Sequence, residues 1–170
     1  MQENPLILTL SIKNDTFLFF NSLRQTYFPA SRNFIDAHLT LFHALPNSDA
    51  TISAVEEIVH KQNPFSIVVI EPVSIGKGVA YKIESKELMQ LHKALQSKWQ
   101  NNLLPQDKQK LWPHITVQNK VHPQEAKDLL HSLKKDFAPF RSIAEGLELW
   151  EYLNGPWKFI KKFDFAQPKL

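Results

Sequence analysis

The sequence predicts an α+β fold with two pseudo-symmetric lobes, each a mostly antiparallel sheet with helices outside, flanking a central cleft. Three observations lead to this prediction. The chain has 170 residues, of which 43% are hydrophobic and 22% charged, and this suits a single domain with a packed core. Strand and helix patterns follow each other in the same order in both halves. Four landmark positions also recur at nearly equal spacing in the two halves.

Short apolar and β-branched runs predict seven strands. In chain order they are Leu6–Ile12, Ala37–Leu45, Phe65–Ile70, Val79–Ile83, His114–Val121, Phe140–Leu153 and Trp157–Phe165. Gly76-Lys77-Gly78 predicts a hairpin turn before the fourth strand, and Asn154-Gly155-Pro156 predicts the turn between the last two.

Apolar residues spaced near the 3.6-residue period predict four helices between these strands. The expected N-caps are Asn14 or Asp15 for the first helix, Ser48 for the second and Ser85 for the third. Asn63-Pro64 should end the second helix, and Pro123 should lie in the first turn of the fourth. The polar segment Asn101–Lys110 predicts a loop.

The internal repeat is anchored on His38-Leu39-Thr40 and His114-Ile115-Thr116. Pro64 follows the first histidine by 26 residues and Pro139 follows the second by 25; the corresponding glycines, Gly78 and Gly155, follow by 40 and 41. We infer one bilobal domain over residues 1–170, with a lobe of about 1–84 and a lobe of about 85–170, each carrying one His-x-Thr motif.

Composition narrows the classes of function. The 20 Lys and Arg against 17 Asp and Glu give a formal charge of +3, which permits a polyanionic partner without requiring one. The absence of cysteine excludes disulfides, thiolate metal sites and a cysteine nucleophile. The segment Met1–Pro5 lacks the basic residues of a signal peptide, and no apolar run is long enough to span a bilayer. We therefore expect a cytoplasmic protein with no membrane partner, and no obligate protein partner is evident.

The two His-x-Thr motifs carry the chemistry. Of the seven histidines, only His38 and His114 have a threonine two residues later. Side chains alternate along a strand, so each motif presents an imidazole and a hydroxyl on one face, roughly 6.6 Å apart. If the lobes bring both motifs together, the cleft holds a proton acceptor, a proton donor and two hydroxyl donors. An in-line displacement at phosphorus needs this set, and the scheme requires no metal or other cofactor.

These motifs resemble a known family. His38-Leu39-Thr40-Leu41 and His114-Ile115-Thr116-Val117 are similar to the paired H-x-T-x motifs of the two-histidine (2H) phosphoesterase superfamily. Their flanks, Ala37–Pro46 and Trp112–Val121, resemble bacterial 2′-5′ RNA ligase-like proteins. The resemblance extends over both halves of the chain. It implies a bilobal fold and a metal-independent cyclic phosphodiesterase that acts on 2′,3′-cyclic phosphates or 2′-5′ linkages of RNA ends or nucleotides, with ligation as the reverse reaction.

The resemblance also implies roles for single residues. His38 and His114 would be the catalytic acid/base pair, with His114 as the base by family similarity alone, and Thr40 and Thr116 would bind the phosphate. This chain departs from its relatives at Trp112, because they often carry a basic residue two positions before the second histidine.

Strand alternation adds three expectations. Phe42 would share a face with His38 and could stack on a nucleobase, although a place in the core is the more common one for phenylalanine. Gln118 would share a face with His114 and could bind a base or ribose; a surface position at the end of the strand is equally consistent. His43 would face the opposite side from His38 and serve a structural role.

Alternatives to RNA cyclic phosphate hydrolysis remain open at this point. The same site could act on another phosphodiester, such as a 2′-5′ oligoadenylate or ADP-ribose cyclic phosphate. The protein could instead be a non-catalytic RNA or nucleotide binder that retains the cleft, or a hydrolase whose histidines bind a metal.

Overall fold

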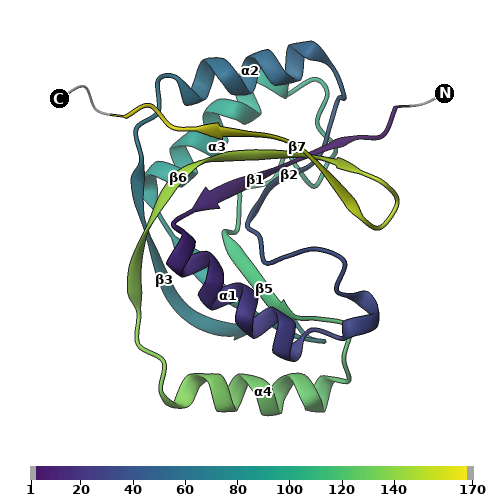
Figure 1. Cartoon of the computed structure of the whole chain (residues 1–170), viewed down its shortest axis with the longest axis vertical. Coiled ribbons are helices and arrows are strands. Elements are labelled where there is room, and N and C mark those ends of the chain that lie inside the picture. Colours follow the sequence, from purple (N-terminus) through teal and green to yellow (C-terminus); the bar gives the residue numbers. More distant parts are fainter. Residues whose placement is uncertain (1–2, 168–170) are drawn as a thin grey trace.

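The structure is a computed structural model that describes residues 3–167. This part of the chain forms one seven-stranded sheet, four α-helices and a short 3-10 helix (Figure 1). The strands are β1 (Leu6–Ile12), β2 (Thr40–Leu45), β3 (Phe65–Ser74), β4 (Val79–Glu84), β5 (His114–Gln118), β6 (Phe140–Tyr152) and β7 (Trp157–Asp164). The helices are α1 (Asn14–Tyr27), η1 (Ala30–Arg32), α2 (Asp49–Val59), α3 (Lys86–Trp99) and α4 (Pro123–Lys135). Each strand pair is antiparallel, and the predicted α+β class is confirmed.

Strands from the two halves of the chain are mixed within one sheet, because β6 of the second half lies between β1 and β3 of the first half. Their order is β2-β1-β6-β3-β4-β5, with β7 paired to β6. The long strand β6 links the sheet, because its first residues pair with β3 and its later residues pair with both β1 and β7. The two strands at the ends of this order, β2 and β5, carry the His-x-Thr motifs. The division of the chain into lobes at about residue 84 stays a prediction.

The repeat detected in the sequence corresponds to repeated elements. Both β2-α2-β3-β4 and β5-α4-β6-β7 run strand, helix, strand, strand. Each unit closes with a hairpin, and the hairpin turns contain Gly76 at φ 84° and Gly155 at φ 149°. The predicted element order in the two halves is therefore confirmed.

The helices pack against different parts of the sheet. α4 lies on β3 and β4, α3 on β3, α2 on β7, and α1 on β5. Figure 1 shows α2 and α3 together at one end of the molecule and α4 at the other. Phe20 of α1 and Phe137 after α4 both meet the ring of Tyr81 edge-on, with centroids 5.4 Å away, so α1, α4 and β4 share one aromatic core. Within residues 3–167, none of the helices has the length and apolar character that crossing a membrane requires.

Two of the three predicted side-chain N-caps are confirmed. The hydroxyl of Ser48 accepts a hydrogen bond from the backbone N–H of Thr51 at 3.3 Å, and that of Ser85 accepts one from Leu88 at 3.2 Å. The prediction for the first helix was wrong, because α1 has Lys13 at its N-cap and no side-chain cap. Asp15 instead lies in the first turn, where negative charge favours the helix dipole.

Three strand boundaries differ from the prediction by three or more residues. β3 continues to Ser74. β2 begins at Thr40 rather than Ala37, because side chains of α1 hold the preceding segment; Asn21 Oδ1, for example, accepts the Ala37 N–H at 2.9 Å. β5 ends at Gln118 rather than Val121, where Lys120 takes a φ of 62° that strands do not use.

Candidate active site

The His-x-Thr motifs occupy equivalent places at the two ends of the sheet order. His38 lies just before β2, and His114 is the first residue of β5. His38, Thr40, His114 and Thr116 are all half-buried, whereas the intervening Leu39 and Ile115 are each 1% exposed. The alternation predicted within each motif is therefore present, with the imidazole and hydroxyl on the accessible side.

Both imidazoles are oriented by the same backbone contact. Nδ1 of His38 lies 2.8 Å from the carbonyl oxygen of Asp36, and Nδ1 of His114 lies 2.7 Å from that of Trp112. A carbonyl only accepts, so Nδ1 carries the proton and donates it. The other nitrogen, Nε2, is then free on each ring to accept a proton or, when protonated, to donate one. This tautomer is the one that acid/base chemistry at the second nitrogen requires.

The environment disfavours the charged form of both imidazoles in the ligand-free protein. Burial lowers the pKa of His38 to about 4. Burial also lowers the pKa of His114. Positive charge nearby adds to the effect: Arg24, His114 and His43 each lower the pKa of His38, and His43 lowers that of His114. The three imidazoles therefore lie within range of each other's electric field, although His38 and His114 come from opposite ends of the sheet order.

A tryptophan packs against each catalytic candidate. Trp112 stacks on His114 with ring centroids 4.1 Å apart and an interplanar angle of 22°, and its indole is 45% exposed. Trp157, at the start of β7, lies 4.6 Å from the His38 ring at a tilt of 52°. These contacts fix the ring planes, and Trp112 supplies an aromatic surface beside His114.

Arg24 of α1 connects the two motifs. It is 5% exposed, and its Nη1 donates to the Thr116 carbonyl at 3.0 Å while its Nε donates to the Ile35 carbonyl at 2.9 Å. Thr116 belongs to the second motif, and Ile35 lies in the segment that leads into His38. The guanidinium also lies 4.0 Å above the Phe28 ring. Burial lowers the pKa of Arg24 to about 10, so it stays charged at neutral pH.

We expect Arg24→Met to destabilise the protein and to reduce turnover. The substitution keeps most of the side-chain volume but leaves buried carbonyls without a donor, at a cost of about 2 to 4 kcal/mol. Urea unfolding measures this loss as a lower midpoint. Arg32→Met is the matched control, because Arg32 is exposed and its loss should change the free energy of unfolding by less than about 0.5 kcal/mol. Equal midpoints for the two variants would contradict this role of Arg24.

A β-bulge follows each motif and corrects the prediction for Phe42. Thr9 of β1 pairs with Thr40 and Leu8 pairs with Phe42, so β2 has one extra residue, Leu41, between these pairs. A bulge shifts the inside–outside alternation by one position. Phe42 is consequently 0% exposed and packs in the core instead of sharing the face of His38. Its ring stacks on His92 at 4.6 Å, so it presents no surface to a nucleobase.

The second bulge corrects the prediction for Gln118 in the same way. Val79 pairs with Gln118 and Ala80 with Thr116, which leaves Val117 as the extra residue of β5. Gln118 is therefore 2% exposed and lies off the face of His114. Among the described residues its buried Oε1 has no hydrogen-bond partner. The side chain is neither on the surface nor placed with the His-x-Thr face, as alternation had suggested.

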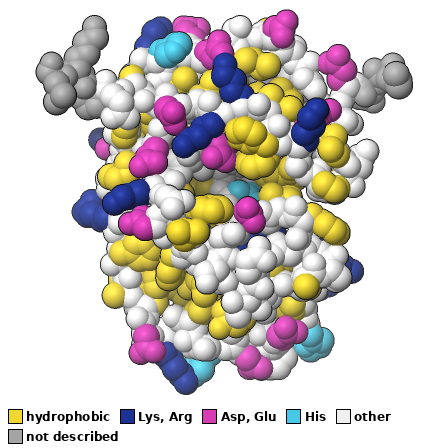
Figure 2. Space-filling view, in the orientation of Figure 1, with side chains coloured by type: hydrophobic (Ala, Val, Ile, Leu, Met, Phe, Trp, Pro, Cys, Tyr) yellow, Lys and Arg dark blue, Asp and Glu magenta, His cyan; other side chains and the backbone are white. Residues whose placement is uncertain are grey.

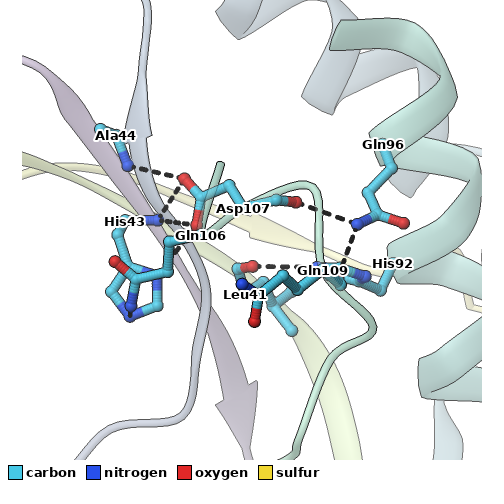
Figure 3. Close-up of polar contacts among 8 residues, drawn as sticks. All are labelled: Leu41, His43, Ala44, His92, Gln96, Gln106, Asp107 and Gln109. Atoms are coloured by element: carbon cyan, nitrogen blue, oxygen red, sulfur yellow. Dashed lines mark hydrogen bonds and ion pairs between the residues drawn. The ribbon is translucent and has the colours of Figure 1, made fainter. Parts of the chain in front are cut away.

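The first bulge also returns His43 to the accessible side of β2, which sequence reasoning missed. Its side chain is 49% exposed. Figure 3 shows how Asp107 holds it: the carboxylate accepts the His43 ring Nδ1–H at 2.9 Å and the backbone N–H groups of His43 and Ala44. Asp107 is 3% exposed, and its hydrogen bonds to His43 and Ala44 lower its pKa despite burial. It anchors the loop after α3 to the end strand β2.

The surface is hollowed beside His38, which lines a cavity. Figure 2 shows a depression across the middle of this view with a histidine side chain visible inside it, and acidic and basic side chains interspersed around it. Among residues 3–167, no three His, Asp or Glu side chains are grouped as ligands for one metal ion. The side chains with acid/base or donor chemistry are the imidazoles and hydroxyls of the two motifs, and the buried Arg24 bonds to the segment before the first motif and to the second motif.

Comparisons with known proteins agree with this geometry. The family model of the 2′-5′ RNA ligase superfamily matches residues 12–156. A Bacillus licheniformis protein named "Putative phosphoesterase" is 29% identical over 152 residues, covering 84% of this chain and 88% of that protein.

Solved structures share the fold. TT0787 of Thermus thermophilus has a TM-score of 0.70 at 14% identity, with 97% of this chain and 100% of that chain covered. Escherichia coli LigT complexed with 3′-AMP has a TM-score of 0.61 at 16% identity, with 97% and 99% covered. The chain belongs to the 2′-5′ RNA ligase superfamily, within the 2H phosphoesterases that its paired motifs indicate.

Proposed function

We propose that the protein hydrolyses 2′,3′-cyclic phosphates at the ends of RNA or on nucleotides, with His38 and His114 as the acid/base pair. The observation that carries the proposal is the repeated contact between each Nδ1–H and the carbonyl two residues earlier, which leaves Nε2 of both rings free. Thr40 and Thr116 are the hydroxyls that donate hydrogen bonds to the phosphate oxygens. No metal takes part in this scheme.

The reaction begins when one neutral imidazole removes a proton from water. The water oxygen forms a bond to phosphorus, and the bond from phosphorus to one ribose oxygen breaks. The other imidazole, protonated at Nε2, gives its proton to that ribose oxygen. The product is a phosphomonoester on the ribose, that is, a nucleoside 2′- or 3′-monophosphate. The two imidazoles then return to their starting protonation states by exchanging protons with solvent. The threonine hydroxyls stabilise the charge on the remaining phosphate oxygens.

Two considerations support this substrate class. The related LigT of E. coli has been crystallised with 3′-AMP and with phosphate, and a 3′-nucleotide is one of the two products that opening a 2′,3′-cyclic phosphate can give. A 2′-5′ phosphodiester can react at the same groups: the base removes a proton from the neighbouring 3′-hydroxyl, whose oxygen bonds to phosphorus, and the acid protonates the 5′-oxygen as its bond to phosphorus breaks, which leaves a 2′,3′-cyclic phosphate. Ligation of a cyclic phosphate end to a hydroxyl is the reverse of that cleavage and needs no further residue.

The pKa values favour His38 as the base. A general base must be neutral before it reacts, and the pKa of about 4 for His38 keeps it neutral over a wide pH range. His114 then serves as the acid. This assignment reverses the one that family similarity alone implies.

We expect a bell-shaped dependence of kcat/KM on pH with its maximum at mildly acidic pH. As the pH rises, activity should first increase near pH 4, where the base His38 loses its proton. It should then decrease as the acid His114 loses its proton, and because the pKa of His114 is lowered, this limb should begin below the ordinary histidine pKa of about 6.5. Steady-state assays of a 2′,3′-cyclic nucleotide from about pH 3.5 to 9 would measure this. A maximum above about pH 8, with no limb below about pH 6.5, would contradict the proposal.

A further inference from the structure

A cavity of about 340 Å³ opens beside His38. It lies over the pairs β1–β6 and β6–β7, and α1 closes one side of it. The side chains that matter here are Thr9, Ser11, Glu148, Trp150, Lys162 and His38. Its volume is at the lower end of the range for small-ligand sites, and sharing His38 places it next to the proposed reacting phosphate.

Glu148 lies in this cavity without a partner. It is half-buried, and burial raises its pKa. Among residues 3–167, no side chain or backbone group makes a hydrogen bond or ion pair with its carboxylate. Lys162 stands opposite on β7 and its charge partly offsets the rise in the pKa of Glu148, but its ammonium makes its ion pair with Asp164 at 3.4 Å. A desolvated carboxylate with unused acceptors is costly unless a ligand supplies donors.

An aromatic wall leads from this carboxylate to the catalytic candidate. Trp150 Nε1 donates to Thr9 Oγ1 at 3.0 Å, which fixes the indole. The Trp150 ring lies 6.1 Å from Trp157, and Trp157 lies 4.6 Å from His38. Indole rings of this kind stack on nucleobases regardless of sequence. A ligand with its base against Trp150 would extend its ribose toward His38.

The charge of the cavity indicates which end of a nucleotide enters it. Asp36 and Glu145 line it together with Glu148, and Lys162 is the one cation among its lining residues within the described chain. A phosphate would be repelled by three carboxylates, whereas an uncharged base with N–H donors would be attracted. The phosphate therefore belongs at the histidines and threonines, and the base belongs in the cavity.

We propose that this cavity is a nucleobase subsite and that Glu148 selects guanine. The proposal rests on the proposed function, since it names the substrate that the same site prefers. A carboxylate only accepts hydrogen bonds and can bind two adjacent donors. Guanine presents such a pair, N1–H and the 2-amino group. On adenine, cytosine and uracil the single donor group of that edge lies next to at least one acceptor, which a carboxylate repels.

The test compares binding and turnover across bases. Quenching of tryptophan fluorescence would measure the Kd of the 3′-monophosphates of guanosine, inosine and adenosine, and steady-state assays would measure kcat/KM for their 2′,3′-cyclic phosphates. We expect guanosine to be preferred over inosine, which lacks only the amino group, by about tenfold or more. Glu148→Gln should remove most of this preference, because an amide can also donate to the acceptors of the other bases. Glu125→Gln is the control, because it makes the same charge change at an exposed position on α4.

The outcomes separate this proposal from the proposed function. Equal Kd values for guanosine and inosine in the wild-type protein would overturn the guanine subsite, whatever the variant does and even if cyclic phosphates are hydrolysed. A guanosine preference that survives Glu148→Gln would also overturn it. Guanine-selective binding that depends on Glu148, without turnover of any cyclic phosphate, would support the subsite and refute the proposed hydrolysis.

Discussion

Replacing His38 or His114 with alanine is expected to lower kcat on a 2′,3′-cyclic nucleotide by about 10² to 10⁴ for each substitution. Each change removes one of the two groups that move protons, while the hydroxyls of Thr40 and Thr116 stay in place. Binding of a nucleoside monophosphate should change much less than kcat. Initial rates, with binding measured separately, give this comparison. His131→Ala is the matched control, because His131 is exposed on α4 and its loss should leave kcat unchanged.

The roles of the two histidines can then be distinguished by the leaving group. An aryl phosphodiester releases a phenolate that needs no proton, so it should restore much of the activity lost with the acid but none of that lost with the base. With His38 as the base, the His114→Ala variant is the one that such a substrate rescues. Rescue of His38→Ala alone would reverse the assignment, and wild-type turnover of the cyclic nucleotide by either variant would contradict the two-histidine mechanism itself.

Gly78→Ala is expected to destabilise the protein by about 3 kcal/mol or more. A Cβ at Gly78 would overlap the backbone carbonyl of Gln118 and lie 2.6 Å from the Cα of Asn119. These contacts are backbone atoms, which a side-chain adjustment cannot move, so β4 and β5 would have to separate. Thr116 lies two residues before Gln118, and turnover should fall as well. Urea unfolding followed by circular dichroism measures the stability.

Gly76→Ala provides the control for this prediction. Gly76 lies in the same turn and has a φ of 84°, but no atom lies within 4 Å of a Cβ built there. Its cost is conformational strain alone, about 1 to 2 kcal/mol, with activity retained. If Gly78→Ala were no more destabilising than Gly76→Ala, the close approach of β4 and β5 would not be a constraint on the fold.

Sequence patterns were sufficient for most of the secondary structure and for the internal repeat. Hydrophobic periodicity and turn residues located each strand and α-helix but not the 3-10 helix η1, and the nearly equal spacing after His38 and His114 identified the repeat. The order of the strands in the sheet was not accessible this way, because β6 inserts between β1 and β3 through contacts that are distant in sequence. The local pattern of β6 is the same whichever neighbours it has.

The residues around the motifs were predicted less well, and the two bulges are the reason. Strict alternation placed Phe42 and Gln118 beside the histidines and His43 on the far side. One extra residue in each strand inverts all three placements. The extra residues are Leu41 and Val117, which are ordinary strand formers, so neither a glycine nor a turn residue marks either bulge in the sequence.

Contacts between distant segments account for the other omissions. Asp107 lies in a polar loop that resembles any exposed connection, yet it is buried against β2. Arg24 occupies a helix position where a charged residue ordinarily faces solvent, and its buried role depends on carbonyls from β5 and from the segment before β2. The cavity that Glu148 lines is formed by residues of β1, β6 and β7 together, so its place there could not be predicted from the sequence around it.

Phosphorus NMR of a 2′,3′-cyclic nucleotide incubated with the protein in EDTA tests the central claim most directly. The account predicts that the cyclic phosphate signal is replaced by that of a phosphomonoester with the wild-type protein, and that it persists with His38→Ala and with His114→Ala. The position of the product signal also reports which ester bond breaks. The account would be contradicted if the cyclic signal persisted with the wild-type protein, or if it disappeared as fast with both variants as with the wild-type protein.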